Sequence, residues 1–307
     1  MKKKVLVLGG GISKERIISL ETAKCVYREL IKKNYKVVIC EPNKKLITTI
    51  KSFKPDVVFN ALHGQFGEDG YIQTILESQK VKYTHSGVLA SFIAMNKEIS
   101  KKIYIKNKIL TPKYIKFNFN KVNKIDKNLV FKIQKKLNFP VVIKPINEGS
   151  SVNVYICDKK NFIKNLKKLI SYREILIEKY IPGREIQVAI LGKRKLGAIE
   201  LKPKRKFYDY EAKYNAKAKT KHIIPVDLSK KNLNKVMNIA LKAHKLIGCR
   251  GVTRSDFKYF QNKFYLLETN TQPGMTKLSL VPEIANYVGM TFIDLIEWIL
   301  KDGSIKR

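Results

Sequence analysis

Apolar residues follow two different patterns along this chain. In the first 95 residues, short β-branched runs alternate with stretches in which apolar positions recur at helical spacing. We predict strands at residues 4–8, 36–40 and 56–60, a helix at residues 13–33 and a short helix around residues 48–52. This alternation is typical of a doubly wound parallel sheet, whose ligands bind beyond the carboxyl ends of the strands. The glycine-containing loops at residues 9–13 and 62–64 occupy that position.

The second pattern begins near residue 97. It predicts a polar loop at residues 118–128, a helix at 131–137, a buried strand at 139–145, a tight turn at 148–151, a helix near 159–170 and a strand at 175–179. Beyond residue 184 we expect mainly antiparallel strands, at 186–191, 195–201, 251–259 and 264–268, with helices at 233–247 and 292–300. Residues 204–221, rich in Tyr and Lys, predict a long loop, and long loops in enzymes are usually lids.

Composition adds a strong positive charge but little information about partners. The 307 residues carry a formal net charge of +37, yet nine of the 62 basic residues are Arg and the other 53 are Lys. Phosphate and base recognition favours Arg, and the lysines are dispersed instead of forming one stripe. We attribute the excess to coding bias and expect no specific nucleic-acid partner. A DNA-binding protein remains the alternative that the charge alone suggests.

Other classes are excluded more firmly. No apolar run is long enough for a transmembrane helix, and the basic start lacks the long apolar region of a signal peptide, so we expect a cytoplasmic protein without a membrane partner. The four cysteines are scattered and fit neither a zinc site nor a disulfide framework.

The first glycine loop has two interpretations. Gly9, Gly10 and Gly11 follow a strand as in dinucleotide-binding proteins, but Lys14 stands where the third glycine belongs and Glu41 is only approximately placed as the ribose-binding acid. A dehydrogenase is therefore disfavoured. The alternative is a helix start with free backbone N–H groups suited to an anion.

Several ionisable residues stand beside such glycine-rich turns. Glu15 either complements the helix dipole or binds a ligand. His63, directly after a strand, is the better functional candidate in its loop, where Glu68 and Asp69 also fit a surface turn. Lys144 ends an apolar strand, an unusual place for an unpaired lysine. With Lys97 it would supply two cations for a polyphosphate.

The strongest pattern lies late in the chain. Asp256 lies on one predicted strand, and Glu268 and Asn270 share one face of the next because strand side chains alternate with period 2. Two carboxylates and an amide facing a cleft suit Mg²⁺, which binds few protein groups and leaves positions for phosphate.

At this point the motifs resemble a family. GGGISKER, ALHGQFGEDG, VVIKPINEGSS, YDYEAKY, RSDF, LLETNTQPGMT and SLVP are similar, in order and spacing, to the D-alanine–D-alanine ligases of the ATP-grasp superfamily, from about residue 4 to 298. The resemblance implies an α/β ATP-grasp fold. It comprises a Rossmann-like substrate domain (1–95), a central ATP-grasp subdomain (96–182) and a C-terminal one (183–307) with a lid at 204–221.

In such ligases ATP phosphorylates one D-alanine, and the amine of a second attacks the acyl phosphate to give D-alanyl-D-alanine for peptidoglycan precursors. The resemblance implies two Mg²⁺ ions, for which Mn²⁺ can substitute, and a homodimer. The implied ATP contacts are Lys97, Lys144, Glu178, Glu185 and Lys213. The implied metal ligands are Asp256, Glu268 and Asn270.

Substrate contacts are implied in the same way. Glu15 would bind the first ammonium, linked through Ser150 to Tyr214, with His63 nearby. The groups expected at the transferring phosphate, the oxyanion and the second carboxylate are Arg254, Gly274, Ser279 and Leu280.

Two questions stay open at the level of sequence. A ligase joining D-alanine to D-lactate or D-serine is the rival within the superfamily, and Tyr214 bears on it because related D-lactate ligases resemble this chain with Phe there. Ile12, Asn153 and Ser255 depart from the usual family pattern. These departures remove no charge or ligand, so we expect them to affect loop detail and KM and to leave the reaction intact.

Overall fold

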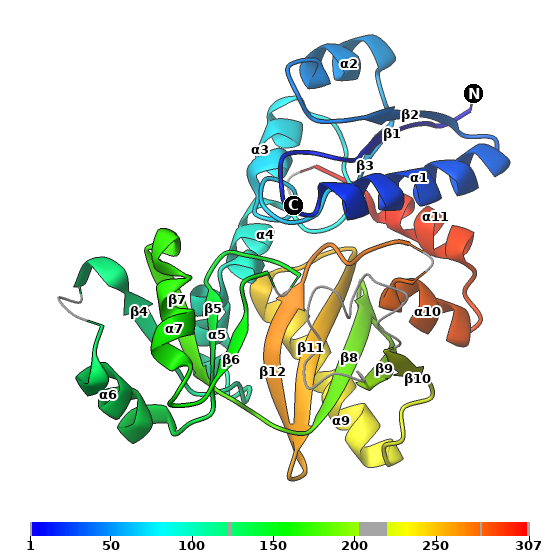
Figure 1. Cartoon of the computed structure of the whole chain (residues 1–307). Helices are drawn as coiled ribbons and strands as arrows, with labels where there is room; N and C mark the ends of the chain where they lie inside the picture. Colours follow the sequence, from blue (N-terminus) through cyan, green and yellow to red (C-terminus); the bar gives the residue numbers. More distant parts are fainter. Residues whose placement is uncertain (1, 122–124, 151, 203–219, 277, 306–307) are drawn as a thin grey trace.

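The computed structural model describes residues 2–121, 125–150, 152–202, 220–276 and 278–305, which form three sheets and their covering helices (Figure 1). The first sheet is parallel, with the order β2-β1-β3. Its strands are β1 (Lys4–Leu8), β2 (Lys36–Cys40) and β3 (Val57–Asn60). The three strands predicted in this part of the chain are confirmed.

Helices cover both faces of this parallel sheet. Alternate residues of β1 point to opposite faces: Val5 and Val7 pack with α1 (Arg16–Lys32), whereas Leu6 and Leu8 pack with α2 (Leu46–Phe53) and α3 (Tyr71–Ser78). The doubly wound arrangement is therefore confirmed. Helix α1 begins later than residue 13 because the Ser13 hydroxyl accepts the Glu15 N–H in a turn that precedes the helix.

The second sheet is antiparallel, with the order β4-β7-β5-β6. It contains β4 (Tyr114–Asn118), β5 (Val141–Pro145), β6 (Tyr155–Cys157) and β7 (Glu174–Lys179), and its apolar side is covered by α6 (Lys127–Leu137) and α7 (Phe162–Lys167). The loop predicted at residues 118–128 is too long. It contains a 3₁₀ turn, η1 (Phe119–Lys121), and Asp126 caps α6 through the N–H groups of Asn128 and Leu129.

The third sheet confirms the antiparallel strands predicted beyond residue 184. Its order is β10-β9-β8-β11-β12, all antiparallel. The strands are β8 (Arg184–Leu191), β9 (Arg194–Lys202), β10 (Lys221–Ile223), β11 (Val252–Phe260) and β12 (Lys263–Asn270). Helix α9 (Lys230–Ile247) packs on one face. Of the predicted lid, residues 204–219 lie outside the described residues, and Lys221 opens β10.

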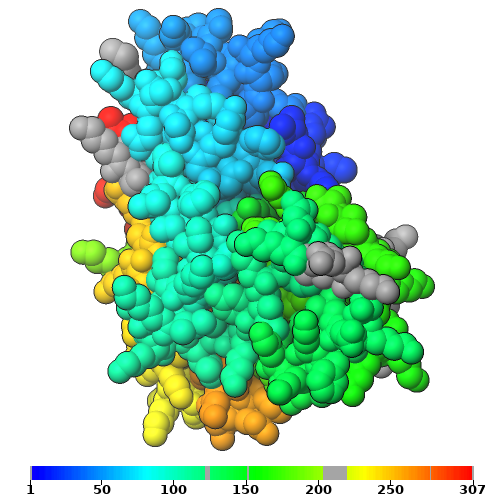
Figure 2. Space-filling model, turned by 90° about the vertical axis from the view of Figure 1, so that its left-hand side faces the viewer, coloured from blue at the N-terminus to red at the C-terminus, as the bar shows by residue number. Residues whose placement is uncertain are grey.

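Four helices connect these sheets. α4 (Val88–Met95) lies between the first sheet and the other two, whereas α5 (Lys97–Lys106) lies against β12 and α9; neither helix was predicted. In the space-filling view, the N-terminal residues, blue to cyan, lie above the green central segment (Figure 2). α10 (Leu280–Tyr287) packs beside the third sheet, and α11 (Phe292–Asp302) returns to the first, where Leu295 and Ile299 join the core around Val5 and Val7.

No helix in the described ranges is long and apolar enough to cross a membrane. The domain boundaries at residues 95 and 182 stay predictions.

Candidate active site

Two adjoining cavities open where the three sheets meet. The loop cavity is lined by Glu15, His63, Glu68, Ala94, Met95, Lys97, Glu148, Gly149, Ser150, Arg254, Glu268, Thr269, Asn270, Thr271 and Gly274. The sheet cavity, between the two antiparallel sheets, is lined by Lys97, Pro112, Val142, Lys144, Pro145, Glu148, Val152, Val154, Glu178, Lys179, Tyr180, Ile181, Glu185, Asp256, Lys258, Leu267 and Glu268. Lys97, Glu148 and Glu268 line both cavities, so a ligand in one lies next to a ligand in the other.

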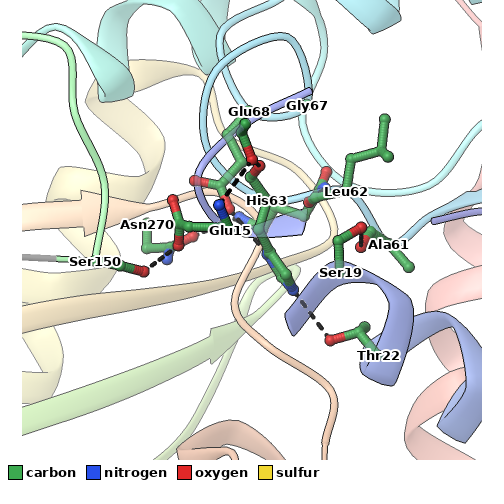
Figure 3. Close-up of polar contacts among 12 residues, drawn as sticks. Glu15, Ser19, Thr22, Ala61, Leu62, His63, Gly67, Glu68, Ser150 and Asn270 are labelled. Atoms are coloured by element: carbon green, nitrogen blue, oxygen red, sulfur yellow. Dashed lines mark hydrogen bonds and ion pairs between the residues drawn. The ribbon is translucent and has the colours of Figure 1, made fainter. Parts of the chain in front are cut away.

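Glu15 presents a buried carboxylate to the loop cavity. It stands just before α1, is 5% exposed and accepts a hydrogen bond from the Ser150 hydroxyl (Figure 3). A Cβ atom added at Gly64 would lie 2.7 Å from Glu15 Oε2, and one added at Gly149 would lie 2.8 Å from it. Both glycines therefore leave room for the carboxylate, and two segments far apart in sequence meet around it.

His63 lies beside Glu15 in a buried hydrogen-bonded chain (Figure 3). Its Nδ1 is 3.0 Å from Glu68 Oε1, and its Nε2 is 3.0 Å from Thr22 Oγ1. Burial raises the pKa of the Glu68 carboxyl, although its hydrogen bond with His63 opposes this. The surface-turn interpretation is therefore wrong for Glu68. It holds for Asp69, whose carboxylate accepts two backbone N–H groups of the turn.

The first glycine loop does not offer a free anion site. The Gly10 N–H donates to Ser19 Oγ at 2.8 Å, and the Gly11 N–H donates to Glu41 Oε1 at 2.9 Å. The Arg16 guanidinium binds the same Glu41 carboxylate, and this arginine holds the pKa of that carboxyl below its usual range. The prediction of open N–H groups is wrong because the Ser19 hydroxyl already accepts the Gly10 N–H and the Glu41 carboxylate already accepts the Gly11 N–H.

The sheet cavity contains a buried cluster of lysines around one glutamate. Glu178 is 2% exposed, with Lys144 Nζ 3.0 Å from its Oε2 and Lys101 Nζ 3.0 Å from its Oε1. Burial opposes ionisation of Glu178, but the two lysines outweigh it and hold the pKa of the carboxyl below its usual value. Burial lowers the pKa of Lys97 and takes that of Lys101 to about 8.

Carboxylates near the mouth of the sheet cavity are also paired. Glu185 Oε2 lies 3.0 Å from Lys258 Nζ. Arg254 makes a bidentate contact with Asp256, at 2.8 and 3.0 Å, and also donates to Gln187 Oε1. Glu268 Oε2 lies 3.5 Å from Lys97 Nζ, whose ammonium also donates to the carbonyl of Glu148.

The proposed metal ligands meet as the strand pattern predicts. Asp256 pairs with Glu268 across β11 and β12, and Arg254 pairs with Asn270. Glu268 and Asn270 line the loop cavity, while Asp256 and Glu268 line the sheet cavity. Three oxygen-bearing side chains at this junction fit the preference of Mg²⁺ for oxygen ligands.

A smaller hollow adjoins the loop cavity at the start of α10. It shares Arg254 and Gly274 with the loop cavity, and Ser279 and Leu280 also line it. Ser279 stands just before α10, and its hydroxyl accepts the Thr276 N–H at 2.9 Å. A side chain at Gly274 would meet Ser279 Oγ at 2.8 Å, so glycine keeps this passage open.

The structure thus brings together fourteen of the residues singled out from sequence, whereas Lys213 and Tyr214 lie outside the described residues. Thr22 and Lys101 are not among the residues that the sequence pattern singles out. Lys101 lies four positions after Lys97, and this spacing places the two lysines on the same face of a helix. That spacing is the one feature of the sequence that could have associated Lys101 with the site.

Two antiparallel sheets around a lysine-lined cavity, beside a parallel three-stranded sheet, form the ATP-grasp fold. The family model for the C-terminus of D-ala D-ala ligase matches residues 104–301, and the model for its N-terminus matches residues 41–86. The chain belongs to the D-alanine–D-alanine ligase family.

Individual relatives agree with this membership. A D-alanine–D-alanine ligase of Pelagibacter ubique is 73% identical over the full length of both chains, and one of Wolbachia pipientis wMel is 41% identical, covering 97% of this chain and 94% of its own. The crystal structure of the Bacillus anthracis enzyme aligns with a TM-score of 0.85 at 34% identity. The same enzyme complexed with ATP aligns at 0.83 and 30% identity. Each alignment covers 98% of this chain and 97% of the other.

Proposed function

We propose that this protein joins two D-alanine molecules into D-alanyl-D-alanine at the expense of ATP, through an acyl phosphate, for peptidoglycan precursors. Its family membership supports this activity, as does its likeness to a structure described as complexed with ATP. The observation that supports the proposal best is the pair of adjoining cavities. The loop cavity contains the buried Glu15 carboxylate, the sheet cavity contains Lys97 and Lys144, and the two cavities meet at Glu268.

ATP would occupy the sheet cavity. Lys97 and Lys144 are buried side chains that line this cavity and would meet the phosphates, and the apolar side chains of Val142, Ile181 and Leu267 would border the base. Glu178 and Glu185 would face the adenine amine and the ribose. The resemblance also assigns Lys213 to the phosphates, and this residue lies outside the described ranges.

Asp256, Glu268 and Asn270 would hold two Mg²⁺ ions, with Mn²⁺ able to substitute. When bound, these ions neutralise phosphate charge during the transfer. Arg254 already lies between Asp256 and the loop cavity, so its guanidinium can stay with the phosphoryl group as that group moves toward the first D-alanine. Gly274 would direct its N–H to the oxyanion of the tetrahedral intermediate.

The loop cavity would bind the first D-alanine. Its ammonium meets the Glu15 carboxylate, which Ser150 orients, and His63 lies alongside. The carboxylate of the second D-alanine would reach Ser279 and Leu280, where the N-terminus of α10 favours an anion. Tyr214, assigned to closing over the first substrate, lies outside the described residues.

The proposal also covers the setting of the enzyme. We place it in the cytoplasm, where ATP is available, acting as a homodimer without a nucleic-acid or membrane partner. The dispersed lysines support the absence of a specific polyanion site outside the sheet cavity.

A phosphate-release assay with ATP, Mg²⁺ and D-alanine tests the proposal. We expect release with D-alanine, none with L-alanine, loss on chelation, and D-alanyl-D-alanine as the product on chromatography. A second arm adds D-lactate. Preferential formation of the D-alanine–D-lactate ester would assign the rival activity, and no D-alanine-dependent release would refute the proposal.

A further inference from the structure

Lys101 is a buried lysine that lies behind the sheet cavity. Its side chain, one turn after Lys97 on α5, is 0% exposed. Its ammonium donates to Thr111 Oγ1 at 2.6 Å, contacts Glu178 Oε1 at 3.0 Å and lies 5.8 Å from the centre of the Tyr114 ring. Glu178 lines the sheet cavity and Lys101 does not, so Lys101 can reach a ligand there only through Glu178.

Glu178 has one cation on each carboxylate oxygen. Lys144 contacts Oε2 from the cavity side, and Lys101 contacts Oε1 from behind. A carboxylate that is 2% exposed is costly to leave ionised without a cation, and removing one partner of a buried pair is much more damaging than removing both. The two lysines differ in that only Lys144 can turn toward a ligand.

We propose that Lys101 is a positioning residue, the permanent counter-ion of Glu178 that releases Lys144 to the phosphates of ATP. The inference rests on the proposed function, in which Lys144 binds those phosphates. When the ammonium of Lys144 moves to a phosphate, Glu178 keeps one cation and stays ionised. Without Lys101, Glu178 would retain the Lys144 ammonium more strongly. The phosphates of ATP would then have to compete with the Glu178 carboxylate for Lys144, and ATP would bind more weakly.

The test compares two adjacent lysines of α5. Lys101→Met removes the buried ammonium at similar length, and Lys102→Met removes its exposed neighbour, which pairs with Glu98 at 2.7 Å. We expect Lys101→Met to raise the KM for ATP at least about tenfold, on the scale of losing one buried cation, and to leave the KM for D-alanine within about twofold. Lys102→Met should leave both constants within about twofold, as expected for an exposed ion pair.

A double-variant cycle tests whether the effect passes through Glu178. In the Glu178→Gln background no carboxylate holds Lys144, so adding Lys101→Met should change the KM for ATP by less than about twofold. Titration with a non-hydrolysable ATP analogue gives the same comparison as a Kd without turnover. This separates failure of the inference from failure of the proposed ligase activity.

A purely structural role predicts other results. The inference is overturned if Lys101→Met raises both KM values alike, or lowers kcat alone, or weakens ATP binding equally in the Glu178→Gln background. If Lys101→Met does not fold, Glu178→Gln and the double variant decide between the two roles. Equal Kd values for the analogue support the inference, and a difference above about threefold refutes it.

Discussion

The loop cavity and the sheet cavity share a wall, but the carboxylates that line only one of them have different partners. In the sheet cavity each carboxylate already has a cation: Glu178 has Lys101 and Lys144, Glu185 has Lys258, and Asp256 has Arg254. In the loop cavity, Glu15 is held by the neutral hydroxyl of Ser150. A polyanion would therefore exchange partners with ion pairs that already exist, whereas an ammonium would meet a Glu15 carboxylate that makes no ion pair with any residue that the structure describes.

The largest expected effect arises where the two cavities join. Glu268→Gln keeps the shape of the side chain but removes a charge that borders both ligands, so kcat should fall at least about a hundredfold, on the scale of losing one strong electrostatic contact. Steady-state turnover with D-alanine and Mg²⁺ measures this. Glu174→Gln, at an ion pair with Lys116 away from both cavities, is the control and should retain kcat. Near-full kcat in Glu268→Gln would contradict the metal assignment.

A change on the loop-cavity side should separate the two substrates. Glu15→Gln removes the charge that meets the first ammonium, a charged contact worth about 1.5–3 kcal/mol, so the KM for D-alanine should rise about ten- to hundredfold. The KM for ATP should stay within a few fold, because Glu15 lines only the loop cavity of the two. An equal rise in both KM values would contradict the assignment of D-alanine to the loop cavity and ATP to the sheet cavity.

A variant that shifts the Glu15 carboxylate without removing its charge tests the same contact with a smaller expected effect. In Gly149→Ala the new Cβ would stand 2.8 Å from Glu15 Oε2, so the carboxylate must shift. The KM for D-alanine should rise about two- to tenfold, the range for weakening one hydrogen bond. Kinetics that match the wild-type protein would show that Glu15 tolerates this displacement.

The smallest effect on catalysis is expected outside both cavities, at His244. This ring lies on α9 within 2.8 Å of Thr253 Oγ1, and burial lowers the pKa of His244 from 6.5 to about 4. Between these values the unfolded chain binds a proton that the folded chain does not, so acidification destabilises the fold. Between pH 7 and 5 this linkage amounts to about 2 kcal/mol of unfolding free energy.

Denaturant titrations at both pH values check this prediction, with His244→Gln as the comparison. The variant should lose less stability on acidification while keeping its kcat at pH 7. Identical losses in the two proteins would mean that other groups carry the acid sensitivity.

Much of the fold and of the catalytic junction follows from local pattern. Period-2 alternation predicts Glu268 and Asn270 on one face, and both side chains line the loop cavity, which agrees with that prediction. β-branched runs likewise located the parallel strands of the first sheet.

Other features depend on contacts that no local pattern contains. In a chain with 53 lysines, the spacing from Lys97 places Lys101 on the same helix face but does not indicate that it lies beneath Glu178, 77 residues later. The Glu41 carboxylate at Gly11 follows the end of another strand, and together with the Ser19 hydroxyl at Gly10 it occupies the N–H groups of the glycine loop. Glu68 resembled a turn residue because its burial depends on His63 and the surrounding loops.

The return of α11 to the first sheet has a consequence for biosynthesis. Val5 and Val7 are synthesised about 290 residues before Leu295 and Ile299, which complete their core. Until those later residues leave the ribosome, the face of β1 that packs with α1 lacks the apolar contacts that α11 supplies. Exposed apolar surface of this kind promotes aggregation of nascent chains and makes them chaperone substrates. We expect the nascent protein to depend on chaperones until α11 is free to dock on the first sheet.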